Sequence, residues 1–233
     1  MTQKQEQRNY NRRYPEEYGF GGSAFYYWFL YFVVCPVGYI FYKAKVTGRD
    51  NIDPKKRYIF AANHNSYIDP PMVSLAVNRK VSYMAKEELF THKNWLLRHL
   101  VIWLRAFAVN RSKPELATFK TIKDLVDKTN WSIGIFPQGT TTMGNDLTNM
   151  QKGFVVVAKK AKMDIVPVAI VGFDGYAKYP FQKNLTLKIG SPISYELPDD
   201  EIMYKWVQFM CKEAGYHHDD FDKMAAVKTA DCN

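Results

Sequence analysis

Cysteine is scarce in this chain, and its positions exclude two classes of small protein. The 233 residues include three cysteines, Cys35, Cys211 and Cys232, which lie far apart without any Cys-x-x-Cys pair. An odd number of separated cysteines argues against a disulfide scaffold or a zinc ribbon and is typical of a reducing compartment. A polar cluster near the C-terminus also lacks a second cysteine at ligand spacing, so we expect no metal site there. This cluster consists of Cys211, His217, His218, Asp219 and Asp220.

The sequence also lacks internal repeats and any second apolar run long enough to cross a membrane. Hydrophobic residues make up 47% of the chain and charged residues 24%, close to the average for globular proteins. This composition excludes wholesale disorder and collagen-like structure, and the chain is long enough to bury a core without cross-links. We expect one domain, with or without an appendage.

The chain is basic and rich in aromatic residues. Lys and Arg outnumber Asp and Glu by 32 to 23, which gives a net charge of +9, and 15% of the residues are aromatic. Such a composition favours either nucleic acid or an anionic membrane surface as a partner. A nucleic-acid-binding module should carry its aromatics beside basic residues, whereas here they are densest in the uncharged residues 24–41. We therefore expect a membrane surface with anionic lipids and no nucleic acid, with the nucleic-acid module as the alternative.

The apolar run near the N-terminus contains no charged residue from residue 18 to residue 42. As a helix, residues 24–41 would reach about 27 Å, marginally the thickness of the hydrocarbon core. Tyr and Trp in its first half are typical of a membrane interface, while Pro36 and Gly38 predict a kink or a break at its far end. Basic residues flank both sides, so charge gives no orientation. We expect a membrane-embedded helical segment that spans the bilayer or lies in one leaflet; a buried core helix is the alternative.

The rest of the chain alternates short apolar runs, which predict strands, with helix-periodic stretches. This alternation indicates an α/β fold, with a mixed, mostly parallel sheet sandwiched by helices. We divide the chain into a basic leader and membrane anchor (1–47), an α/β domain (48–215) and a polar tail that frays (216–233). The expected strands are residues 58–62, 81–85, 106–109, 133–136, 165–171 and 185–189. The expected helices are residues 71–78, 94–104, 114–128, 149–162 and 199–213.

Polar clusters directly follow four of the expected strands. They are residues 63–70, 86–88, 110–111 and 137–142. The carboxyl ends of parallel strands meet at one edge of a sheet, and open α/β sheets bind their ligands outside that edge. The sequence therefore predicts an active site at this edge.

His64 and Asp69 are the first candidates for chemistry at that edge. Their offset of five turns about 140° on a helix, so on one helix they would not face each other. They can meet if His64 lies in the loop after the strand and Asp69 begins the next helix, as Pro70 favours. A carboxylate that holds one imidazole nitrogen leaves the other to act as a general base. The alternatives are a structural histidine and a helix-capping aspartate.

The run Phe-Pro-Gln-Gly-Thr-Thr-Thr at residues 136–142 is the second candidate. Gly139 frees the backbone to turn after the strand, so that exposed N–H groups and hydroxyls can form an anion cradle. Arg111 offers a bidentate partner for a phosphate.

Together these segments resemble the glycerolipid acyltransferases typified by 1-acylglycerol-3-phosphate acyltransferase. Their order and spacing over residues 58–171 are specific, although each block alone is not. An apolar N-terminal segment ahead of the first block is also similar to the family. The blocks are Asn63-His64-Asn65-Ser66-Tyr67-Ile68-Asp69, Phe107-Ala108-Val109-Asn110-Arg111, Phe136-Pro137-Gln138-Gly139-Thr140 and Val166-Pro167-Val168-Ala169-Ile170.

The resemblance implies direct acyl transfer, with no covalent enzyme intermediate and no cofactor. His64, oriented by Asp69, would deprotonate the sn-2 hydroxyl of 1-acylglycerol-3-phosphate, whose oxygen then attacks the thioester of acyl-CoA or acyl carrier protein to give phosphatidic acid. It also implies a place at the cell membrane, with the catalytic domain facing the cytoplasm. Arg111, Gly139 and Thr140 would hold the acceptor phosphate. The residues we assign to substrate binding are Asn63, Ser66, Lys86, Arg111, Gln138, Gly139 and Thr140.

The chain departs from the family pattern at two positions and leaves two other enzyme readings open. Gln138 replaces the usual Glu and Thr141 the usual Arg or similar donor, so the acceptor is lysophosphatidic acid or another lysophospholipid. Lys152 is a candidate for the missing cation. A Ser/His/Asp hydrolase that uses Ser66 with His64 and Asp69 is disfavoured because no Gly-x-Ser-x-Gly turn exists. A membrane-tethered pseudoenzyme is argued against by the intact His/Asp pair.

Overall fold

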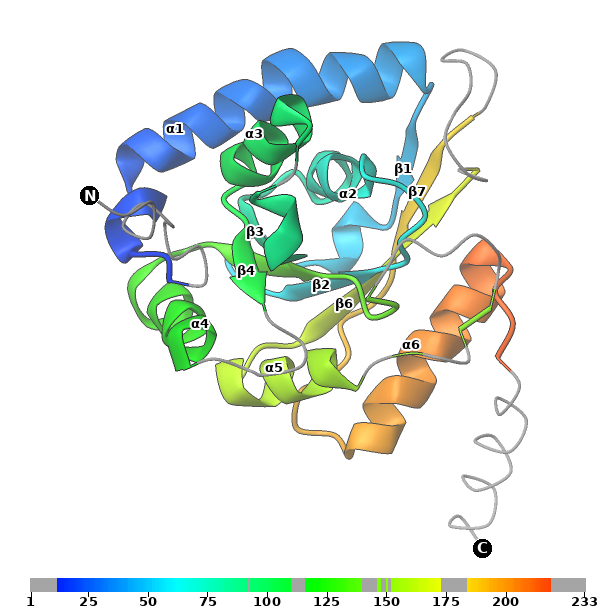
Figure 1. Cartoon of the computed structure of the whole chain (residues 1–233). Coiled ribbons are helices and arrows are strands. Elements are labelled where there is room, and N and C mark those ends of the chain that lie inside the picture. The colour runs from blue at the N-terminus through cyan, green and yellow to red at the C-terminus, as the bar shows by residue number, and fades with distance from the viewer. Residues whose placement is uncertain are drawn as a thin grey trace, which may run out of the picture.

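The computed structural model describes residues 12–91, 93–109, 116–139, 146–147, 150, 152–172 and 184–218. Within these residues a seven-stranded sheet lies between two layers of helices (Figure 1). The strand order is β1-β7-β6-β2-β5-β3-β4, and each neighbouring pair is parallel except β6 with β7. The expected α/β fold with a mixed, mostly parallel sheet is confirmed.

The strands follow the apolar runs of the sequence with one exception. All four residues of β2 are buried, as expected of a central parallel strand covered on both faces. The exception is β1, which the sequence does not predict because its three residues, Lys45–Thr47, alternate in exposure and contain no apolar run. The bounds are β1 Lys45–Thr47, β2 Ile59–Ala62, β3 Val81–Lys86, β4 Phe107–Val109, β5 Ser132–Ile135, β6 Ile165–Val171 and β7 Thr186–Ile189.

The helices of the domain are sorted onto two faces by the handedness of the connections. The chain moves from β2 to β3 to β4 in one direction along the sheet and then returns through β5 to β6. Right-handed crossovers therefore place α2 and α3 on one face and α4 and α5 on the other, with α6 packed on β6 beside α5 (Figure 1). The bounds are α2 Asp69–Val77, α3 Trp95–Trp103, α4 Leu116–Lys128, α5 Gly153–Ala161 and α6 Asp199–Ala214.

The N-terminal apolar run forms one continuous helix, Phe20–Phe41. It begins as α1 (Phe20–Phe29) and continues through two π-helical turns, Leu30–Val34 and Val37–Phe41. The predicted break at Pro36 and Gly38 is therefore wrong. The wider π-helical turn, which bonds the Cys35 N–H to the Leu30 carbonyl, accommodates the ring of Pro36 without ending the helix.

This helix is long and apolar enough to cross a membrane by length and composition, with a mean hydropathy of 1.6, yet one face packs against the domain. Tyr26, Phe29, Leu30 and Val34 are buried in the common core, and the Tyr26 hydroxyl donates to Ser74 Oγ of α2 at 2.8 Å. The opposite face is open, since only 28% of the apolar window is buried. The helix is neither a core helix nor a separate appendage.

Two of the predicted boundaries are corrected by this packing. Residues 12–47 do not stand apart from the domain, because their helix shares its core and β1 pairs with β7. The predicted tail does not fray at its start, because Tyr216 and His218 are 6% and 7% exposed. Residues 219–233 lie outside the described residues.

Candidate active site

The loops that follow β2, β3 and β5 meet at one edge of the sheet, as the sequence predicts. This edge gathers His64, Lys86, Pro137 and Gly139 around one cavity. Asn110, Arg111 and residues 140–142 were also predicted to lie here, but they fall outside the described residues.

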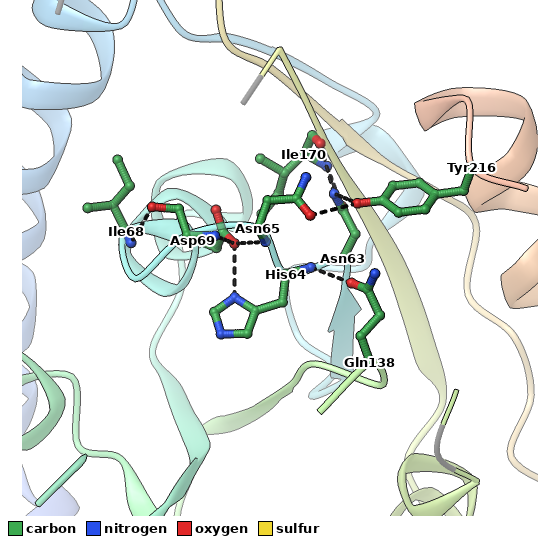
Figure 2. Close-up of polar contacts among 9 residues, drawn as sticks. Asn63, His64, Asn65, Ile68, Asp69, Gln138, Ile170 and Tyr216 are labelled. Atoms are coloured by element: carbon green, nitrogen blue, oxygen red, sulfur yellow. Dashed lines mark hydrogen bonds and ion pairs between the residues drawn. The ribbon is translucent and has the colours of Figure 1, made fainter. Parts of the chain in front are cut away.

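His64 and Asp69 meet in the predicted way. β2 ends at Ala62, His64 lies in the following loop, and Asp69 is the first residue of α2. His64 Nδ1 lies 2.9 Å from Asp69 Oδ2, and Figure 2 shows the imidazole directed at the carboxylate. The side chain of Asp69 is 1% exposed and that of His64 16%, so the carboxylate is covered while the imidazole reaches the cavity.

The surroundings of Asp69 assign the proton on the imidazole. Asp69 Oδ2 also accepts the backbone N–H groups of Asn65 at 2.6 Å and Ser66 at 2.7 Å. Asp69 Oδ2 thus accepts from two N–H groups, and a carboxylate oxygen accepts hydrogen bonds from a ring N–H in the same way. His64 therefore donates its Nδ1–H to Asp69, and Nε2 carries the lone pair that a general base requires.

Two contacts from the loop after β5 hold His64 in place. The ring of Phe136 stacks on the imidazole with centroids 4.2 Å apart. Gln138 Oε1 accepts the backbone N–H of His64 at 2.6 Å, and its side chain is almost fully buried. Gly139 then turns the chain with a φ of +76°, a conformation that favours glycine.

Asn63 and Ser66 take positions that differ from the predicted contact with substrate. Asn63 is fully buried, donates to the Ile170 carbonyl at 2.9 Å and accepts from the Ile170 N–H at 2.7 Å. Ser66 is 3% exposed, and its Oγ accepts from the Ile68 N–H at 3.4 Å. Neither residue lines the cavity, so this geometry supports a role for both in holding the loop.

The cavity in front of His64 has a volume of about 420 Å³ and a mainly apolar lining. Its walls come from β3, β4, α3, α4 and α5, and its lining includes His64, Leu104, Ala106 and Ile122. Lys86, one of the predicted substrate-binding residues, lies on its wall. The sequence did not reveal this cavity, since its lining residues have the spacing of ordinary core residues.

Lys152, the candidate for a missing cation, forms an exposed ion pair with Asp200 at 3.1 Å and does not line the cavity. Among the described residues, no group of three or more His, Cys, Asp or Glu side chains is placed to hold a metal ion. Cys211 is partly buried, which raises the pKa of its thiol.

Curated relatives share part of this chain. A 1-acyl-sn-glycerol-3-phosphate acyltransferase of Cocos nucifera is 26% identical over 66% of this chain and 51% of its own length. The enzyme of the same name from Streptococcus pneumoniae is 29% identical over 59% of this chain and 50% of its own length. The enzyme of that name from Borreliella burgdorferi is 29% identical over 64% of this chain and 57% of its own length. The chain thus spans about half the length of the curated relatives it matches.

A solved structure shares the fold. The 1-acyl-sn-glycerophosphate acyltransferase PlsC of Thermotoga maritima superposes with a TM-score of 0.57 over 89% of this chain and 95% of its own, at 19% identity. The family model described as Acyltransferase matches residues 43–171, more than half of the chain and the segment that holds the His64–Asp69 pair. The chain therefore belongs to the acyltransferase family.

Proposed function

We propose that this protein transfers a fatty acyl group from an acyl thioester to the sn-2 hydroxyl of 1-acylglycerol-3-phosphate, giving phosphatidic acid. The observation that carries the proposal is the His64–Asp69 pair at the mouth of an apolar cavity. The names of the relatives support the same acceptor. Another lysophospholipid is the alternative acceptor, because Gln138 stands where the family usually has Glu.

The transfer uses His64 as a base and then as an acid. Nε2 takes the proton of the sn-2 hydroxyl while its oxygen forms a bond to the thioester carbonyl carbon. The carbon–sulfur bond then breaks, and the leaving thiolate takes the proton from the imidazolium to give a free thiol. Asp69 keeps the Nδ1–H tautomer throughout and stabilises the imidazolium that forms.

The cavity suits the acyl chain of a substrate. Its length is lined by aliphatic and aromatic side chains, and each buried methylene of a chain contributes about 0.8 kcal/mol. The reacting carbonyl would then lie at His64, where the polar edge of the sheet begins. Lys86 on the wall and Gly139 at the turn are our candidates for contacts with the polar part of a substrate.

The outer face of helix Phe20–Phe41 supports a membrane surface as partner. It exposes Phe20 at 92%, Phe32 at 71% and Ile40 at 62%, too many large apolar side chains on one face for a protein surrounded by water. Because the inner face packs on the domain, we propose that the helix lies in one leaflet along the membrane surface. The net charge of +9 would add attraction to anionic lipids. Orientation toward the cytoplasm, and the choice between coenzyme A and acyl carrier protein, stay predictions.

The test uses purified protein in detergent with a long-chain acyl-CoA and 1-acylglycerol-3-phosphate. Free thiol and phosphatidic acid are measured together, with His64→Ala beside the wild type. We expect equal amounts of both products, and a fall of about 10²–10⁴-fold in the variant, as is typical for loss of a general base. His99→Ala is a matched control, since His99 is half-buried on α3, does not line the cavity and is hydrogen-bonded to the Trp95 carbonyl.

Three results would contradict the proposal or redirect it. Thiol without phosphatidic acid would indicate a thioester hydrolase. Product on another lysophospholipid alone would retain the reaction and change the acceptor. Absence of product with both acyl-CoA and acyl carrier protein, over a panel of lysophospholipids, would refute acyl transfer.

A further inference from the structure

Tyr216 reaches the catalytic loop from the other end of the chain. It follows Gly215, which ends α6 in the left-handed conformation with a φ of +68°. The turn sends the tyrosine back toward the sheet, where its side chain is 6% exposed. Figure 2 shows its hydroxyl group between Asn63 and Asn65.

The hydroxyl of Tyr216 bonds to both residues that flank His64. It accepts from Asn63 Nδ2 at 3.0 Å and donates to Asn65 Oδ1 at 2.9 Å. A single hydroxyl that accepts on one side and donates on the other fixes the orientation of both amides.

Each of the two asparagines also bonds to a different part of the site. Asn63 bonds both backbone groups of Ile170 in β6, whereas the backbone N–H of Asn65 donates to the catalytic Asp69 at 2.6 Å. The backbone N–H of His64 itself donates to Gln138. The peptide groups on both sides of the imidazole are thus restrained from three directions.

His217, the residue after Tyr216, contacts Asp146 and Leu147. The Leu147 N–H donates to the His217 carbonyl at 2.9 Å, and Asp146 forms a parallel bridge with His217. Burial raises the pKa of Tyr216, against the opposing effect of its side-chain hydrogen bonds, so its hydroxyl keeps its proton at neutral pH.

From these contacts we infer that Tyr216 is a positioning residue for acyl transfer, which holds His64 at the mouth of the cavity through Asn63 and Asn65. The inference rests on the proposed function. Tyr216 does not line the cavity and so acts through the two asparagines. A small displacement of a catalytic group lowers the rate of the chemical step, and a shift of about 1 Å can cost about 100-fold.

The first test compares Tyr216→Phe with Tyr195→Phe. Both lose one hydroxyl, but Tyr195 is away from the site and bonds the exposed Glu196 at 3.3 Å. We expect kcat of Tyr216→Phe to fall about 10- to 100-fold with little change in KM, and Tyr195→Phe to match the wild type. Unchanged kcat, a change in KM alone, or an equal loss in the control would overturn the inference.

The second test requires no activity. The proton shared by His64 Nδ1 and Asp69 should give a downfield proton NMR signal, which is assigned by its absence in His64→Ala. We expect this signal to shift or broaden in Tyr216→Phe and to stay in place in Tyr195→Phe. An unmoved signal in Tyr216→Phe would overturn the positioning role, even if the wild type proves inactive as an acyltransferase.

Asn65→Ala breaks the same hydroxyl bond from the other end and keeps the inference testable if Tyr216→Phe does not fold. Where both fold, their losses of kcat should not add in the double variant, because both remove one contact. Fully additive losses would contradict a shared path through Asn65.

Discussion

The catalytic loop at residues 63–69 and the outer face of helix Phe20–Phe41 depart from the usual arrangement of a globular protein in opposite senses. The loop is polar, yet Asn63, Ser66 and Asp69 are buried. The helix face is apolar, yet Phe20, Phe32 and Ile40 are exposed. Folded proteins normally bury apolar side chains and leave polar ones in water.

Each departure has a cost that some partner must offset. A buried carboxylate requires hydrogen-bond donors, and the fold supplies Asp69 Oδ2 with one imidazole and two backbone N–H groups, while Oδ1 is buried with no hydrogen-bond partner among the described residues. An exposed apolar face requires a medium other than water, which the fold does not supply. The comparison teaches that the fold itself supplies most of the partners of the buried polar loop, whereas no described residue covers Phe20, Phe32 or Ile40 on the outer face of the helix.

The largest effect should come from the buried carboxylate. Asp69→Asn keeps an oxygen acceptor at the start of α2 but removes the charge that holds the imidazole proton on Nδ1. We expect kcat to fall about 10²–10⁴-fold, measured as phosphatidic acid formed at saturating substrates. Asp53→Asn is the control, because Asp53 only caps an exposed turn through the Lys55 N–H. Activity above a tenth of the wild type in Asp69→Asn would show that the pair does not act as a unit.

The second effect concerns the exposed face of the helix. Changing Phe32 and Ile40 together to Ser should weaken binding to anionic vesicles at least about 100-fold, since burial of each large apolar side chain contributes about 1.5–3 kcal/mol. Co-sedimentation measures the partition coefficient, and unchanged urea unfolding verifies the fold. Leu116→Ser, which removes an 81% exposed side chain from α4 on the other face, should have no effect. Equal loss in that variant would contradict binding through the helix.

A buried polar group outside the site sharpens the comparison at high pH. Burial raises the pKa of Tyr18 to about 12, and its hydroxyl bonds Ser82 Oγ at 3.1 Å. The neutral phenol is favoured in the folded state, so this contribution to stability is complete below about pH 10 and is lost as pH rises through about 12. Between about pH 10 and pH 12 the free energy of unfolding of the wild type, measured in urea, should fall by about 2–3 kcal/mol more than that of Tyr18→Phe. If the free energy of unfolding changed with pH in the same way in both proteins, the proposed contribution of the Tyr18 hydroxyl would be contradicted.

The smallest effect concerns the apolar wall of the cavity. Ala106 lines it and is 2% exposed, so Ala106→Leu should shorten the space left for an acyl chain. We expect kcat/KM for a long-chain donor to fall about 10-fold, because a few methylene groups of its acyl chain can then no longer be buried in the cavity. A short-chain donor serves as the internal control and should keep its rate. Equal losses with both donors would indicate damage to the fold in place of a shortened cavity.

The positions of six of the seven strands and the His64–Asp69 pair were predictable because both follow from local chemistry. Apolar runs of four to seven residues, separated by helix-periodic stretches, can bury themselves only in a covered sheet. A proline disfavours helical conformation in the residues before it and is itself favoured in the first turn of a helix. Pro70 therefore predicts that a helix begins near Asp69, and α2 does begin there.

The roles of Gln138, Asn63 and Tyr216 were not predictable, because each depends on a contact between distant segments. Against the family pattern, Gln138 lacks only the negative charge of the usual Glu. In the structure, its amide oxygen accepts the backbone N–H of His64, 74 positions away. Tyr216 meets Asn63 across 153 positions and was assigned to a fraying tail. No local pattern distinguishes such a tyrosine from a solvated one.

The sequence by itself determined the fold class, the edge of the site, the His64–Asp69 pair and the apolar helix, since these depend on side-chain type and short spacing. Only the tertiary structure decided which face of that helix is covered, where the apolar cavity lies, and what restrains His64. The physical reason is that a cavity and a buried hydrogen-bond network exist only when several elements pack together. Their members therefore look like ordinary core and loop residues until the chain is folded.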